Sequence, residues 1–116
     1  MNISNLVQKW SNINAPSKIV IITDEVQKEF ALEIKNEGIY NVRVEYFSQS
    51  NEFSELLKSL SELKESDLLI VMLSLDTFVE HGANQYFSPF DKPEGIKAKY
   101  IFVRLGISKE SLIQGL

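Results

Sequence analysis

The sequence contains no cysteine among its 116 residues. This absence excludes disulfide bonds, thiolate zinc sites and cysteine nucleophiles together. A basic segment is missing as well, because 12 Lys and Arg stand against 16 Asp and Glu and the formal net charge is −4. Domains that bind nucleic acid usually carry a basic face. We therefore expect no nucleic-acid partner.

Long apolar runs are also absent from the sequence. No run approaches the roughly 18 residues that a membrane span requires, and the amino-terminal segment lacks the basic and apolar regions of a signal peptide. We therefore expect no membrane partner and a cytoplasmic location. Hydrophobic residues make up 44% of the chain and charged residues 24%, which is typical of a globular domain with a packed core.

Four short apolar runs predict β-strands. Residues 19–23 and 67–73 are almost continuously apolar, as in strands that are buried on both faces of a sheet. Residues 42–46 alternate between apolar and charged side chains, which is typical of a strand at the sheet edge. A fourth strand is expected over 99–105.

Helical patterns separate these strands. Apolar residues recur every three or four positions over 3–10, 26–34 and 53–63, and a short helix is expected from about 76 to 82. The helix after the first strand should bury four apolar side chains, those of Val26, Phe30, Ala31 and Ile34. It should end at Gly38.

Alternating strands and helices predict a single α/β domain over residues 1–116. We expect a four-stranded parallel sheet of order 2-1-3-4 with helices on both faces, in the manner of Rossmann or flavodoxin-like three-layer folds. The chain stops at Leu116, about two turns into a helix newly capped by Ser108, without a stop signal. We therefore expect it to be the amino-terminal part of a longer protein.

Polar side chains follow the strands at the edge where ligands bind in open parallel sheets. The candidate rim consists of Thr23 and Asp24 after the first strand and Ser74 and Asp76 after the third. A structural interpretation competes with this one, because Asp24, Asp76 and Ser108 are residue types that cap helices. Further polar residues at strand ends are Glu25, Ser48, Ser50, Gly106 and Ser108.

Recognisable catalytic or cofactor motifs are missing. Neither glycine-rich phosphate loop occurs, and the third strand lacks the terminal acid of a phospho-acceptor domain. Asp76 and Glu80 should share a helix face with His81, the only histidine, turned partly away. That set falls short of the ligands zinc requires. We therefore expect no catalytic residue, no metal ligand and no cofactor in this chain.

The segment 82–95 is long for a loop in a small domain and contains Tyr86, Phe87 and Phe90. These aromatic side chains have two interpretations. They fold back over the domain's own core, or they form a docking loop for another domain or subunit.

Three stretches carry a family resemblance: IITDE over 21–25, DLLIVMLS over 67–74 and KAKYIFVRLGISKESL over 97–112. The chain resembles the amino-terminal domain of leucyl aminopeptidases of the aminopeptidase T-like metallopeptidase family. The resemblance implies a non-catalytic α/β domain that packs on a carboxy-terminal catalytic domain or shapes its cleft. A divalent metal is then expected in that later domain, and none of the family's metal ligands maps onto this chain.

A second hypothesis is a standalone flavodoxin-like domain that binds a small ligand or a protein. Under the first hypothesis the partner is the chain's own carboxy-terminal domain or a second copy. An enzyme complete within 116 residues is the least favoured, because no convergent site can be assembled from the residues present.

Overall fold

The computed structural model describes residues 18–36, 41–47 and 51–103. Several predicted features lie outside these ranges. They are the helix over 3–10, the helix end at Gly38, the polar residues Ser48, Ser50, Gly106 and Ser108, and the helix after Ser108.

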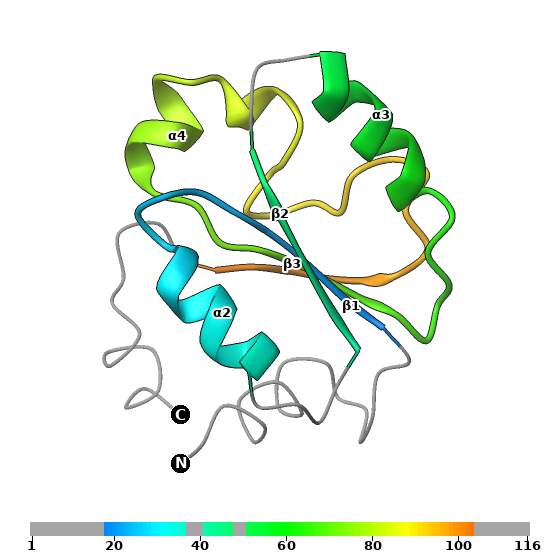
Figure 1. Cartoon of the computed structure of the whole chain (residues 1–116). Coiled ribbons are helices and arrows are strands. Elements are labelled where there is room, and N and C mark those ends of the chain that lie inside the picture. The colour runs from blue at the N-terminus through cyan, green and yellow to red at the C-terminus, as the bar shows by residue number, and fades with distance from the viewer. Residues whose placement is uncertain (1–17, 37–40, 48–50, 104–116) are drawn as a thin grey trace.

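The described part of the chain forms a four-stranded parallel sheet (Figure 1). Its order is β2-β1-β3-β4, which confirms the predicted 2-1-3-4 order. Every neighbouring pair is parallel, because the connections from β1 to β2, from β2 to β3 and from β3 to β4 contain helices and return the chain to the same end of the sheet. The strands are β1 (Ile19–Thr23), β2 (Val42–Tyr46), β3 (Leu68–Val71) and β4 (Lys99–Phe102).

Burial follows the position of each strand in the sheet. All residues of β1 and β3 are buried, as their continuous apolar runs predict. β2 is an edge strand, and its residues are exposed or only partly buried. The alternation of charged and apolar residues in β2 therefore reflects an edge with one wetter face.

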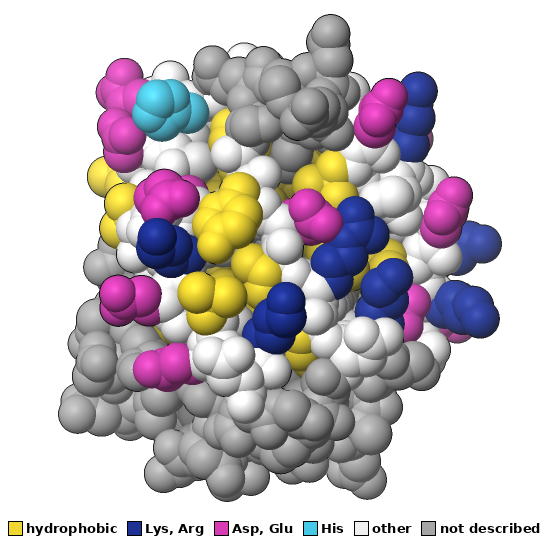
Figure 2. Space-filling model, in the orientation of Figure 1, with side chains coloured by type: hydrophobic (Ala, Val, Ile, Leu, Met, Phe, Trp, Pro, Cys, Tyr) yellow, Lys and Arg dark blue, Asp and Glu magenta, His cyan; other side chains and the backbone are white. Residues whose placement is uncertain are grey.

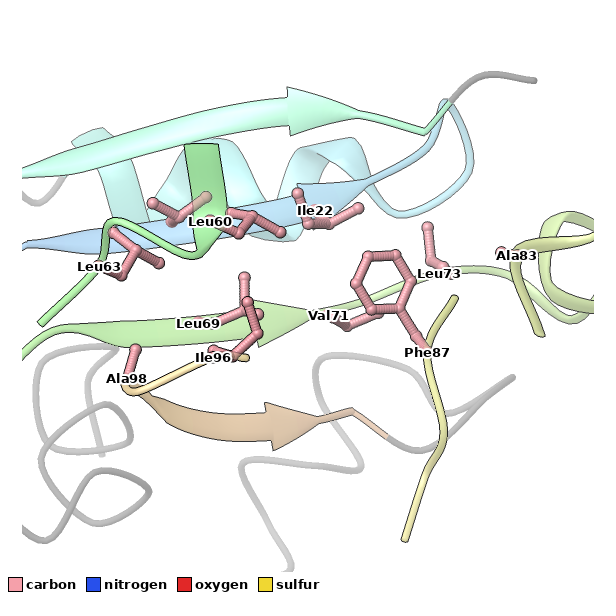
Figure 3. Packing of buried hydrophobic residues seen from close by; sticks show 11 residues of the cluster. Ile22, Leu60, Leu63, Leu69, Val71, Leu73, Ala83, Phe87, Ile96 and Ala98 are labelled. Atoms are coloured by element: carbon pink, nitrogen blue, oxygen red, sulfur yellow. The ribbon is translucent and has the colours of Figure 1, made fainter. Parts of the chain in front are cut away.

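Helices cover both faces of the sheet (Figure 1). α2 (Lys28–Asn36) packs its Phe30, Ala31 and Ile34 against one face. α3 (Asn51–Leu60), α4 (Leu75–Val79) and the segment that follows α4 lie on the other. Figure 3 shows this second core, with the ring of Phe87 near the end of β3 and Leu60 in front of β1.

One predicted core residue is not in the core. Val26 is 71% exposed, because α2 begins only at Lys28 and Val26 lies in the turn before it. The helical spacing of Val26 relative to Phe30 is real in the sequence, but the backbone is not yet helical at that position. Val26 therefore faces the surface near the carboxyl end of β1.

The segment 82–95 is anchored to the sheet instead of standing away from it. It begins with Gly82 in a left-handed conformation, at φ 78°, and then forms the short 3-10 helix η1 (Ala83–Gln85). Phe87 is only 2% exposed and belongs to the second core. The Tyr100 hydroxyl on β4 donates to the Ser88 carbonyl at 2.8 Å. Burial raises the pKa of the Tyr100 phenol, which keeps it protonated as a donor.

Candidate functional site

A hollow of about 460 Å³ opens at the carboxyl ends of β1, β2 and β3. The order of the sheet places a topological switch point between β1 and β3, where the connections leave in opposite directions. The hollow therefore lies where open α/β sheets bind their ligands. Its lining residues are Asp24, Glu25, Val26, Tyr46, Phe47, Ser74, Asp76, Thr77 and His81.

Asp24 links the ends of β1 and β3. Its Oδ1 atom accepts from the backbone N–H of Val26 at 3.0 Å and of Gln27 at 2.9 Å. Its Oδ2 atom accepts from the Ser74 N–H at 2.7 Å and from the Ser74 hydroxyl at 2.8 Å. The same carboxylate thus turns the chain after β1 towards α2 and ties it to the chain leaving β3.

Asp24 is 7% exposed as a whole residue, and its carboxylate remains ionised. Burial on its own would raise the pKa of Asp24, but hydrogen bonds from Thr77, Ser74 and Gln27 together outweigh it and lower the pKa below 3.8. Asp24 therefore has a cap-like role in the turn before α2 and also contributes a negative charge to the hollow.

Ser74 is the N-cap of α4. Its side chain accepts from the Thr77 N–H at 3.3 Å, and its hydroxyl lies 3.2 Å from that of Thr77. The prediction that Asp76 caps this helix is wrong, because α4 starts at Leu75 and Asp76 is in its first turn. Asp76 nevertheless lines the hollow, as the rim interpretation expects.

His81 lies beside Asp76, contrary to the prediction that it turns partly away. Its Nε2 atom is 3.2 Å from Asp76 Oδ2. The difference arises because α4 ends at Val79, so the chain no longer follows helical spacing at His81. Both side chains are more than half exposed, and such pairs contribute little to stability. Figure 2 shows the histidine next to acidic side chains.

Aromatic residues form another wall of the hollow, and the sequence analysis did not assign them to it. Tyr46 ends β2 and Phe47 follows, with its N–H donating to the Thr23 carbonyl at 2.9 Å. The Phe47 ring lies 6.2 Å from that of Tyr86. Their place at the end of a strand is visible in the sequence, but the polar residues that the sequence indicates after this strand are Ser48 and Ser50.

Thr23 is the one predicted rim residue that does not line the hollow. It is fully buried at the end of β1. Its hydroxyl has no hydrogen-bond partner among the residues that the structure describes.

The three aromatic residues of the predicted docking loop differ in burial. Phe87 is a core residue and does not offer a docking surface, whereas Tyr86 is 40% and Phe90 90% exposed. Phe87 is buried because the backbone folds onto the sheet after η1. The folding-back interpretation therefore holds for Phe87, and a docking role is left to Tyr86 and Phe90.

The Ser74 hydroxyl contacts a carboxylate and Thr77 instead of a histidine. Over residues 18–36, 41–47 and 51–103, no group of three or more His, Asp or Glu side chains could hold a metal ion. No helix within these ranges is long and apolar enough to cross a membrane.

Comparison of the chain with protein-family models, with curated proteins and with solved structures found no match. The fold and the hollow are therefore the observations on which a function has to be argued.

Proposed function

We propose that this chain is a non-catalytic binding domain that takes a small molecule in the hollow at the carboxyl edge of its sheet. The observation that carries the proposal is the place of the hollow at the switch point between β1 and β3. Its volume of about 460 Å³ is within the range of small-molecule sites. Its lining combines apolar walls with a few polar groups, which is typical of such sites.

A binding role agrees with how the polar groups are used. Both Asp24 oxygens accept two hydrogen bonds each from the protein, so this carboxylate has little capacity left for proton transfer. Ser74 is engaged with Asp24 and Thr77. These groups hold the shape of the hollow, and the side chains left to meet a ligand are those of the walls and rim.

A fragment screen by NMR tests the proposal. Small aromatic and aliphatic fragments should shift the backbone amides of residues 24–26 and 74–77. Val26→Trp should abolish these shifts, because Val26 lines the hollow but is 71% exposed and can be enlarged without disturbing the core. Val79→Trp is the matched control, since Val79 is also more than half exposed but does not line the hollow. Shifts that survive Val26→Trp would contradict the proposal.

A second candidate is the front domain of a metal-dependent leucyl aminopeptidase. Apolar side chains exposed near the same sheet edge favour it, namely Val26 at 71%, Leu75 at 59% and Val79 at 52%. Exposed apolar clusters mark interfaces. On this proposal the edge packs against a carboxy-terminal catalytic domain or a second copy, and the divalent metal belongs to the catalytic domain.

The mass of the natural polypeptide in its own cells separates the two candidates. A product several hundred residues long, with clustered His, Glu and Asp after Leu116, supports the front-domain proposal. A natural product that ends at Leu116 removes it and leaves the small binding domain.

A further inference from the structure

Asp24 places a buried negative charge beside the hollow, and no cation among the described residues pairs with it. The whole residue is only 7% exposed. Its hydrogen-bond donors are the backbone N–H groups of Val26, Gln27 and Ser74 and the Ser74 hydroxyl, all of them neutral. None of the ion pairs within the described ranges involves Asp24. Neutral donors stabilise the carboxylate but leave its net charge in place, so its field extends into the hollow.

Acidic side chains at the mouth of the hollow add to this field. Glu25 and Asp76 also line it, and their side chains are 79% and 69% exposed. Glu25 pairs with Lys28 at 2.8 Å, and Asp76 pairs with His81. Within the described part of the chain, these three carboxylates have two cationic partners, Lys28 and His81, so this group of residues stays net negative even when His81 is protonated.

The rest of the lining is suited to an apolar body. Tyr46 and Phe47 present aromatic rings, and Val26 adds an exposed aliphatic side chain. Aromatic ring faces attract organic cations, and the attraction grows as water is excluded. An anionic ligand would meet the same walls but would be repelled by the carboxylates.

We infer that the hollow binds a small organic ammonium compound, with the cationic head towards the carboxylates and an apolar body against the aromatic wall. This inference rests on the proposed function and narrows it to one ligand class. The inference rests on one juxtaposition: a buried carboxylate, acidic rim residues and two aromatic side chains line the same hollow.

The amino ends of the strands, at the opposite end of the sheet from the first hollow, provide an internal control. A second hollow of about 380 Å³ lies at the amino ends of the strands, where Lys18, Arg43 and Lys64 contribute cations and Glu62 and Asp67 contribute carboxylates. In Figure 2 most of the visible Lys and Arg side chains lie to the right, across the molecule from the histidine, and further basic side chains lie on the left and at the lower centre. Glu62→Gln therefore removes the same formal charge as Asp76→Asn, but at the other end of the sheet.

Three probes of similar shape test the inference on the whole chain by NMR titration at neutral pH and low salt. They are 2-phenylethylammonium, 2-phenylethanol and phenylacetate. The ammonium should bind roughly tenfold more tightly than the alcohol, and phenylacetate should bind most weakly. Asp76→Asn should weaken the ammonium severalfold and leave the alcohol unchanged. Glu62→Gln should change neither.

Two results would overturn the inference while leaving the proposed function standing. One is equal or tighter binding of the alcohol or of phenylacetate at residues 24–26 and 74–77. The other is an ammonium probe that shifts none of these amides at millimolar concentration although other fragments do. A fragment screen without any hit at the hollow would overturn the inference and the proposed function together.

Discussion

Asp24 shows how one side chain can serve both the backbone and a site. A buried carboxylate is costly unless it accepts several hydrogen bonds, and Asp24 accepts four from Val26, Gln27 and Ser74. Asp24→Ala would leave two buried Ser74 donors without their acceptor. We expect a loss of about 3 kcal/mol in the free energy of unfolding, measured by urea denaturation. Glu25→Ala, which removes an exposed carboxylate next to it, should change stability by less than about 0.5 kcal/mol.

The stability that Asp24 contributes should depend on pH in a defined direction. Its pKa is lowered in the folded protein relative to the usual 3.8, so the unfolded chain takes up a proton at higher pH than the folded one. The contribution is complete above the unfolded pKa and is lost as the pH falls from about 4 through the lower folded pKa. The difference in unfolding free energy between the unmodified chain and Asp24→Asn should therefore be constant from pH 7 to 5 and shrink below pH 4. A difference that grows on acidification would contradict this assignment.

The segment 82–95 gives the clearest prediction at the level of a structural element. Phe87 and Phe90 are only three positions apart, yet one is 2% exposed and the other 90%. Phe87→Ala should cost about 3–5 kcal/mol, because it empties part of the core over β3. Phe90→Ala should stay within about 0.5 kcal/mol. Similar losses for the two variants in thermal or urea unfolding would show that Phe87 does not anchor this segment.

The sequence predicted the elements better than it predicted their ends. The runs that became β1 and β3 are recognisable because burial on both faces demands apolar residues at every position. Val26 was misplaced because helical spacing does not reveal where the backbone becomes helical, and here the Asp24 turn delays that point to Lys28. The proximity of His81 and Asp76 likewise depends on where α4 ends.

The candidate site was predicted in part. Polar residues after β1 and β3 could be placed at one edge, because parallel strands share their direction. The contact between Asp24 and Ser74 could not be specified, since it depends on the register of β1 against β3. The aromatic wall was missed because Tyr46 and Phe47 also read as ordinary strand residues.

For the whole molecule, the sheet order predicts how protection from hydrogen exchange is distributed. β1 and β3 have a strand on each side and are completely buried, whereas β2 lies at the edge of the described sheet. Amides of residues 20–22 and 69–71 should therefore exchange most slowly, at rates that report global unfolding. Those of β2 should exchange faster. Equal protection of β1 and β2 would contradict this expectation and show that the edge is covered.

The hydrogen bonds between Asp24 and Ser74 join residues 50 positions apart in the chain. Forming these bonds closes a long loop, which costs conformational entropy and requires the end of β3 to lie beside the end of β1. A partly folded chain that contains only β1, α2 and β2 therefore has no hollow to offer. Any ligand of the hollow would select molecules in which β3 has already docked and would draw the folding equilibrium towards completion by mass action. A ligand in the hollow would then stabilise only chains in which β3 is already docked.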